Sequence, residues 1–298
     1  MEVFKYKDNY IGNEFIDEED IFLDIETTGV RPYADYAWCI GYSFLRDRDI
    51  ITKQIFIESV KDELASLALL QQELSYFKRI ITFNGEVFDL NFLKNRARSY
   101  KMELVFPEKS YDIYKIFRHN KKFLMMDKID LKSIESLLDI YRDDPLSGKE
   151  TIKLYLDAIS SNSDDKKREL LNHNYYDVKN LPILMEALKY IKSARSYHIK
   201  DNSLFCKNFY CKNDELIIVL DGNKYNIDFY DEFTKVFSND DELTLSFQTK
   251  KTLLEGRECR YFLHNNRVVE TTKNGLLYPI LKDEVIKKLN IIISEHYR

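Results

Sequence analysis

Hydrophobic and polar positions follow two different periods along the first two thirds of the chain. Short apolar runs at residues 21–23, 38–45, 49–57 and 79–83 indicate buried strands. Residues 60–77 instead carry apolar side chains at helical spacing, which predicts an amphipathic helix between the third and fourth strands. Three strands, a helix and a further strand predict a mixed α/β sheet that is flanked by helices.

The two ends of the chain depart from this pattern. Residues 1–20 finish in four consecutive acidic residues, so we expect them to be a surface lead-in to the first strand. Near the other end, residues 215–220 and 225–229 flank the turn sequence Asp221-Gly222-Asn223-Lys224, which predicts a β-hairpin. The other elements expected there are strands at residues 243–248 and 260–264 and a helix at residues 282–297.

The change of pattern indicates two domains. A chain of 298 residues is long enough for one large domain or two smaller ones, each with its own core. Hydrophobic content of 44% and charged content of 32% describe an ordinary globular protein. We therefore expect a first domain at residues 1–192 and a small accessory α+β domain at residues 203–298, whose role the sequence leaves open.

Composition also narrows the cellular setting. Four cysteines are too few for a disulfide scaffold, and neither a membrane-spanning stretch nor a signal-peptide core is evident. These features predict a cytoplasmic protein without a membrane partner. The formal net charge of −5 argues against a general polycation. It leaves nucleic acid open as a partner, because metal ions in an acidic site offset local repulsion.

A first group of candidate chemical residues interrupts the first apolar strand. Asp24 and Glu26 stand two positions apart, and residues i and i+2 of a strand point to the same side. Two adjacent carboxylates repel each other unless a cation lies between them, and a divalent ion with oxygen ligands is the simplest occupant. For this pair alone, two solvated acids at a strand end would be an equally ordinary explanation.

A second group follows the strand at residues 79–83. The dipeptide Asn84-Gly85 is typical of a turn, because Gly85 is free to adopt a positive φ. The helix that follows has Asp89 in its first turn. A carboxylate at that position can simply stabilise the helix. Its place just beyond the carboxyl end of a strand, where ligands gather in open α/β sheets, favours a functional role.

A third group lies on a later helix. His173 and Asp177 are separated by four residues, so both project from one helix face. A histidine one turn from a metal-binding acid suits hydrolysis, because it can accept a proton from water near neutral pH. In isolation, a surface histidine paired with a surface aspartate is the more common arrangement.

In order and spacing, the three groups resemble the DEDD superfamily of 3′–5′ exonucleases, which has a ribonuclease-H-like fold. They are most similar to its YprB-like branch. The resemblance covers roughly residues 20–190 and extends to intervening segments. These are the strand Tyr111-Asp112-Ile113, the helix at residues 131–135, the loop Tyr141-Arg142-Asp143-Asp144-Pro145-Leu146-Ser147-Gly148, and Tyr155 beyond it.

The resemblance implies a five-stranded mixed sheet and a catalytic site built from the three groups. Two Mg²⁺ or Mn²⁺ ions would be held by four carboxylates, and His173 would be the general base. The carboxylates are Asp24, Glu26, Asp89 and Asp177. Residues that would meet the substrate are Thr27, Thr28, Asn84, Phe88, Arg142, Ser147 and Lys149.

The resemblance thus implies a metal-dependent enzyme that hydrolyses phosphodiester bonds from the 3′ end of DNA or RNA by a two-metal-ion mechanism. The expected partner is nucleic acid with a free 3′ end, with single strands favoured. The alternative is a nucleic-acid-binding or scaffolding module on the same fold with weak or no catalysis. The presence of all four carboxylates favours the enzyme, because a catalytically inactive site has no reason to keep like charges together.

Overall fold

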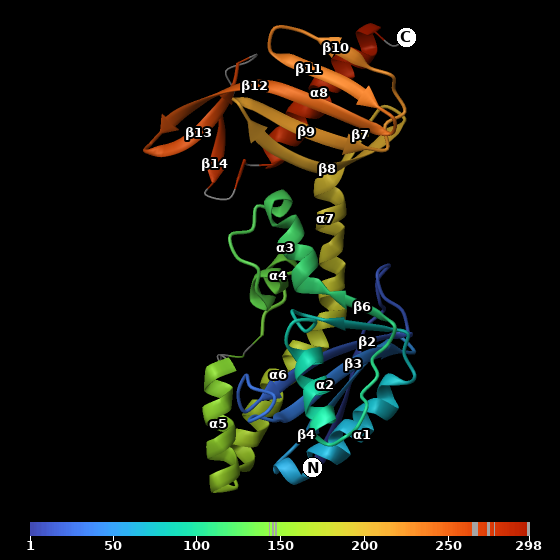
Figure 1. The fold of residues 1–298 in the computed structure, drawn as a ribbon, viewed down its shortest axis with the longest axis vertical. Coiled ribbons are helices and arrows are strands. Elements are labelled where there is room, and N and C mark those ends of the chain that lie inside the picture. Colours follow the sequence, from blue (N-terminus) through green and yellow to red (C-terminus); the bar gives the residue numbers. More distant parts are fainter. Residues whose placement is uncertain are drawn as a thin grey trace. The chain divides into compact units, whose positions relative to one another are not determined.

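The protein divides into two compact units. The computed structural model describes residues 1–142, 144, 146, 148–263, 268–272, 275–276 and 278–296. The first unit comprises residues 1–118 and 128–188, and the second comprises residues 119–127 and 189–298. Figure 1 shows the elements of each unit, which are described separately below.

A mixed sheet of six strands forms the centre of the first unit (Figure 1), in the order β1-β4-β3-β2-β5-β6. The strands β1, β4, β3 and β2 pair antiparallel, whereas β2, β5 and β6 are parallel to one another. This confirms the predicted mixed α/β architecture. The strand bounds are β1 Glu2–Asn9, β2 Asp20–Thr27, β3 Ala37–Arg46, β4 Asp49–Phe56, β5 Arg79–Thr82 and β6 Lys109–Asp112.

The sixth strand is β1, which the sequence analysis took for a surface lead-in. It pairs along its whole length with β4 and forms one edge of the sheet. Burial alternates along the strand: Val3 and Lys5 are exposed, whereas Phe4 and Tyr6 are half-buried. This alternation has the period of a half-buried strand, and the lysines on its outer side are typical of an edge. The expectation of five strands was therefore one short.

Helices cover both faces of this sheet. On one face, α1 and α2 bury leucines such as Leu67, Leu70 and Leu93 against the strands. On the other face, Tyr155 of α5 stacks on Trp38 with ring centroids 5.0 Å apart, next to Leu170 of α6. The helices of the first unit are η1 Val60–Asp62, α1 Glu63–Leu74, α2 Asp89–Ser99, α4 Leu131–Leu137, α5 Gly148–Ser161, α6 Asp164–Leu184 and η2 Met185–Ala187. Helix α3 Ile113–Leu124 begins in the first unit and ends in the second, and nearly all of α7 Leu188–Arg195 belongs to the second.

The second unit contains a nine-stranded antiparallel sheet in the order β15-β14-β13-β12-β9-β8-β7, with β11 and β10 added beside β12. Apolar side chains of α8, such as Leu289 and Ile292, share one core with the strands. Phe123 in the α3 tip joins this core. The bounds are β7 Ser196–Ile199, β8 Asn202–Lys212, β9 Glu215–Asp221, β10 Asp228–Tyr230, β11 Thr234–Asn239, β12 Glu242–Leu254, β13 Arg257–Phe262, β14 Val268–Thr272, β15 Gly275–Leu276 and α8 Tyr278–His296.

The hairpin predicted around Asp221-Gly222-Asn223-Lys224 is wrong. Strand β9 pairs with β8 and β12, and β10 pairs with β11. The turn that closes a hairpin with β9 is instead Asn213-Asp214, where both residues have positive φ, 49° and 61°. Two successive positive φ angles fit the twist of a two-residue hairpin, and Asn and Asp tolerate them.

In the part of the chain that the structure describes, no helix combines the length and apolar character needed to cross a membrane.

Candidate active site

Strand β2 presents two carboxylates to helix α6. Asn174 of α6 donates a hydrogen bond from its side-chain amide to Asp24 Oδ2 at 3.1 Å. Glu26 Oε1 lies 3.4 Å from His173 Nε2 of the same helix. The two carboxylates therefore share one side of the strand, as residues i and i+2 must. Glu26 is buried and Asp24 is half-buried.

Helix α6 reaches these carboxylates because it packs directly on β3. A Cβ atom at Gly41 would lie only 2.2 Å from Asn174 Oδ1 and 2.5 Å from Val178 Cγ2, so no larger residue fits there. Gln54 fixes the same contact by donating to Asn174 Oδ1 at 2.9 Å. Ser43 donates to the carbonyl of Val178 at 2.9 Å. The helix is thus held in register with β2.

Asp89 reaches the site from the other helical layer. It begins α2, and its Oδ1 accepts a hydrogen bond from the backbone N–H of Ile25 at 2.9 Å, between the two β2 acids. The preceding turn places the positive φ at Asn84, 62°, and not at Gly85 as expected. Gly85 serves a close approach instead, because a Cβ there would lie 2.6 Å from Thr82 Cβ.

His173 and Asp177 face the same point from α6. His173 Nε2 lies 3.4 Å from Asp177 Oδ2, the same distance as from Glu26 Oε1. The other ring nitrogen, Nδ1, is 2.8 Å from Asp144 Oδ2. A carboxylate at Nδ1 accepts a hydrogen bond from that nitrogen and leaves Nε2 directed at Glu26 and Asp177. His173 and Asp144 are both buried.

A buried arginine anchors the far side of the site. Arg142 pairs with Asp177 through its Nη1, lies 3.2 Å from Glu135 through its Nε, and lies 3.8 Å from Asp144 through Nη1. Its side chain is only 6% exposed. Asn180 donates to Glu135 at 2.7 Å and completes the arrangement. Arg142 was expected to meet the nucleic-acid backbone, but the structure turns it inward to orient Asp177.

Each of the four carboxylates accepts a hydrogen bond through one of its oxygen atoms from a different donor. Asn174 holds Asp24, and Thr151 donates to Glu26 Oε2 at 3.2 Å. The N–H of Ile25 holds Asp89, and Arg142 holds Asp177. A carboxylate fixed in this way keeps its orientation while its other oxygen faces the shared space.

Burial and mutual repulsion disfavour the charged forms of these acids. Burial raises the pKa of Asp24 well above its ordinary value, and the charges of Asp89, Asp177 and Glu26 add to the effect. Burial likewise raises the pKa of Glu26 and that of Asp89, each to about 7. Among the residues that the structure describes, no lysine or arginine lies within 4.0 Å of the carboxylates of Asp24, Glu26 or Asp89.

These side chains fit a divalent cation. Glu26, His173 and Asp177 each direct one donor atom to a common region, and these atoms lie within 4.8 Å of one another. Carboxylate oxygens are the ligands that Mg²⁺ and Mn²⁺ prefer, and a cation among the acids offsets the burial and the mutual repulsion that raise their pKa values.

The other residues that were expected to bind substrate differ in their exposure and in their hydrogen-bond partners. The hydroxyls of Thr27 and Thr28 bond within their own loop, to the carbonyl of Gly29 at 2.8 Å and that of Tyr36 at 3.3 Å. Asn84 is exposed and Phe88 is half-buried against Phe92, while Lys149 is exposed in the first turn of α5. Ser147 lies outside the described residues.

The sequence analysis missed four residues that shape the site: Asn174, Asp144, Thr151 and Glu135. Asn174 follows His173 directly and faces the sheet, so a helical wheel drawn against β2 would have singled it out. Asp144 stands in the loop that the resemblance had already marked. Nothing in their local patterns singles out Thr151 or Glu135, since both act across long sequence separations.

Comparisons with known proteins agree with this architecture. A model of the RNase H superfamily matches residues 21–189, more than half of the chain. No curated protein shows a significant sequence match.

Three solved structures illustrate the likeness. The family B DNA polymerase from the hyperthermophilic archaeon Pyrobaculum calidifontis is 10% identical with a TM-score of 0.43, over 93% of this chain and 42% of the polymerase. NrnC of Brucella melitensis bound to pGG is 18% identical with a TM-score of 0.33, over 58% and 86%. E. coli Exonuclease I in complex with a dT13 oligonucleotide is 13% identical with a TM-score of 0.31, over 67% and 54%. The chain thus spans less than half of the polymerase that it matches.

Proposed function

The chain belongs to the RNase H superfamily, and from that premise we propose that it is a divalent-metal-dependent 3′–5′ exonuclease of the DEDD type. Its substrate is the free 3′ end of DNA or RNA, preferably single-stranded. Residues 1–192 form the exonuclease domain and residues 203–298 an accessory domain.

One observation carries the proposal. Glu26, His173 and Asp177 direct donor atoms to a common region, the charges of Asp24 and Asp89 interact with the same group, and each of the four carboxylates has one hydrogen-bond partner of its own. A fold gains no stability by bringing like charges together, since each buried acid raises the proton affinity of the next. The arrangement is explained by a ligand that neutralises the charges, and superfamily membership supports nuclease chemistry at that ligand.

Asp24, Glu26, Asp89 and Asp177 would hold the cations. Bound there, two ions would supply Lewis-acid activation of water and neutralise charge on the phosphate and the leaving oxygen. The protein's own task is orientation. Asn174, Thr151, Ile25 N–H and Arg142 fix the acids before substrate arrives, which lowers the reorganisation needed during reaction.

His173 moves the proton. Hydrolysis adds a water oxygen to phosphorus and breaks the P–O3′ bond, so one proton leaves the attacking water and solvent supplies one to the 3′ oxygen. His173 Nε2 accepts the first of these protons, and Asp144 at Nδ1 stabilises the imidazolium that results. Asp144 acts through the ring and is a positioning residue.

The test is incubation of the full chain with 5′-labelled DNA and RNA oligonucleotides in Mg²⁺, Mn²⁺ or EDTA. The expected result is a ladder that shortens from the 3′ end only when metal is present. Shortening from the 5′ end, internal cuts alone, or equal activity in EDTA would contradict the proposal. Retention of the oligonucleotide without cleavage under all conditions would indicate the alternative, a nucleic-acid-binding module.

A further inference from the structure

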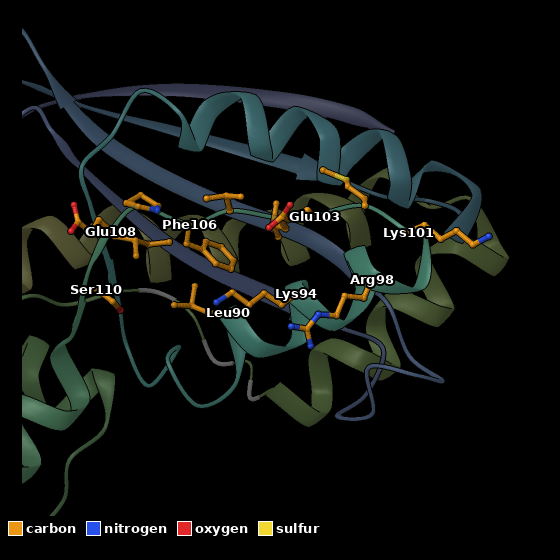
Figure 2. A pocket seen from close by; sticks show the side chains of 13 residues that line it. Leu90, Lys94, Arg98, Lys101, Glu103, Phe106, Glu108 and Ser110 are labelled. Atoms are coloured by element: carbon orange, nitrogen blue, oxygen red, sulfur yellow. The ribbon is translucent and has the colours of Figure 1, made fainter.

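A groove in the first unit lies on the face of α2 that is turned away from Asp89. It has a volume of about 840 Å³ and runs between α2 and the segment at residues 101–110 (Figure 2). Lys94 and Arg98 line it from α2 and follow Asp89 by five and nine residues, which places them about 140° and 180° around the helix. None of the residues that line the groove belongs to the candidate active site. The groove is therefore a separate candidate binding site with a ligand of its own.

The α2 wall of the groove is basic. Lys94 and Arg98 are exposed and four residues apart, so they share one face of the helix. Lys101, just beyond the end of α2, is also exposed and lines the groove. Among the residues that the structure describes, no carboxylate oxygen lies within 4.0 Å of any of the three cations. This wall therefore offers three positive charges to an anionic ligand.

The opposite wall is an extended segment of chain. Exposure alternates along it: Glu103 and Val105 are exposed, whereas Leu104 is buried and Phe106 is half-buried. A period of two is that of a β-strand. Leu104 belongs to the core of the first unit and Phe106 packs against that core, so both side chains point inward.

The backbone of this segment is hydrogen-bonded along one side only. Val105 donates from its N–H to Gln71 Oε1 at 2.6 Å, and its carbonyl accepts from Gln71 Nε2 at 3.3 Å. Gln71 belongs to α1, and no residue of α1 lines the groove. Backbone groups of neighbouring strand residues point to opposite sides, so those of Leu104 and Phe106 face the groove. Within the described part of the chain, neither of these two residues has a backbone hydrogen bond.

We propose that the groove binds an extended acidic segment of a partner protein with the pattern acid–apolar–acid. The bound segment pairs its backbone with Leu104 and Phe106, as a strand added to a sheet edge does. Side chains two positions apart in a strand are about 6.6 Å apart, and Lys94 and Arg98 are about 6 Å apart along the axis of α2. The two acids therefore meet these two cations. The apolar residue between them points to the floor of the groove at Leu90.

Two acids on the segment wall favour a peptide over a nucleic-acid strand. Glu103 and Glu108 line the groove opposite the α2 cations, as Figure 2 shows. A nucleic acid carries a negative charge at every phosphate and would meet both carboxylates, whereas a peptide can carry its acids only where the cations lie. The inference is independent of nuclease activity.

The test measures the fluorescence anisotropy of two fluorescein-labelled synthetic peptides with the full chain in EDTA. The first, Gly-Thr-Glu-Ile-Glu-Thr-Gly, has the proposed pattern. The second, Gly-Thr-Ile-Glu-Glu-Thr-Gly, has the same composition with adjacent acids. The first should bind saturably and at least about threefold more tightly, because adjacent acids point to opposite sides of a strand and only one can meet the α2 cations.

Variants of the basic wall test the charges directly. Lys94→Ala/Arg98→Ala should weaken binding of the first peptide roughly 3–30-fold at low salt, the contribution of two exposed ion pairs. Lys94→Glu/Arg98→Glu should lose this peptide and instead bind Gly-Thr-Lys-Ile-Lys-Thr-Gly, which the unmodified protein should not bind. Misfolding cannot produce such a reversal of preference. The matched control Lys5→Ala/Lys61→Ala removes two exposed lysines elsewhere in the first unit and should bind the first peptide as the unmodified protein does.

Methylation of alternate peptide nitrogens tests the backbone pairing. One of the two alternating sets should abolish binding and the other should leave it nearly unchanged, because an added strand pairs along one edge. Absence of saturable binding, equal affinity for the two peptides, no reversal of preference in the charge-reversed variant, or equal effects of the two methylation patterns would each overturn the proposal. Oligothymidylate that loses affinity in Lys94→Ala/Arg98→Ala, with no binding of the acidic peptide, would overturn it in favour of nucleic acid.

Discussion

The first unit buries acidic side chains in two places, one with a cationic partner and one without. Between α1 and α2, Glu63 is fully buried and is paired with Arg96, whose Nε lies 2.9 and 3.1 Å from its two oxygens. Tyr100 donates a further hydrogen bond to Glu63 at 2.8 Å. At the end of β2, Asp24 and Glu26 are brought together with Asp89 and have no lysine or arginine partner among the described residues.

The contrast shows that the fold can neutralise a buried acid where its role is structural. The Glu63–Arg96 pair links two helices and satisfies its own charges, so it needs nothing from solution. The β2 acids lack such a partner, and their raised pKa values express the resulting cost. We infer that the second group is retained for a ligand and the first for the fold, and mutation should separate the two.

The largest expected effect is that of Asp24→Asn on activity. The substitution keeps the shape of the side chain and removes one ligand charge, so cleavage should fall by about 10³-fold or more. Stability in EDTA should stay level or rise, because one buried charge is removed from a repelling group. Cleavage rates and thermal melts of the same preparation measure both. A melting temperature several degrees lower would assign Asp24 to the structural class of Glu63.

His173→Ala should reduce turnover by ~10²–10⁴-fold, the usual contribution of a positioned general base, while metal affinity changes little. An acidic limb should remain in the pH–rate profile, because Glu26 and Asp89, whose pKa values are each about 7, must still lose their protons to bind metal. Single-turnover rates across pH, beside metal titrations of the same variant, provide the measurement. Loss of stability with intact turnover per folded molecule would give His173 a structural role.

Glu63→Gln is the converse test. It should leave cleavage by the folded protein unchanged and lower the free energy of unfolding by about 3–5 kcal/mol, because Arg96 keeps its buried charge without a counter-ion. Denaturant unfolding in EDTA measures the loss, and Asp24→Asn under the same conditions is the matched comparison. Equal stability of the two variants would remove the distinction between the sites.

The contrast also explains which features the sequence could predict. Strands β2 to β5 and helices α1 and α6 follow from hydrophobic periods that tertiary contacts reinforce. Strand β1 was missed because its alternation is half polar and lies at an edge, where burial selects residues weakly. The hairpin at Asp221-Gly222 was misplaced because the strands on either side pair elsewhere, and local turn chemistry cannot choose partners.

In the candidate site, too, some residues could be predicted from the sequence and others could not. The spacing of Asp24 and Glu26, and of His173 and Asp177, places each pair on one face because both spacings are geometric consequences of strand and helix. The role of Arg142 was misjudged, because a loop arginine looks solvent-exposed until the fold encloses it between Glu135 and Asp177. Its partners lie far away in sequence, and only the fold brings them together.

The smallest expected effect is a pH dependence of stability without metal. The pKa values of Glu26 and Asp89 are each about 7 in the folded protein, and that of Asp24 is also raised, whereas unfolded carboxyls titrate near 4. Between these limits the folded state binds more protons than the unfolded state, so stability falls as pH rises. In EDTA the melting temperature should therefore be several degrees lower at pH 8 than at pH 5.5.

Metal should reverse this trend, because a cation replaces the protons that the acids lose. Millimolar Mg²⁺ should raise the melting temperature more at pH 8 than at pH 5.5, where protons compete for the same oxygens. Asp24→Asn should show a smaller pH dependence in EDTA, and Glu63→Gln should retain the full dependence despite its lower stability. A melting temperature in EDTA that increases from pH 5.5 to pH 8 would mean that the β2 acids are neutralised within the fold, as Glu63 is.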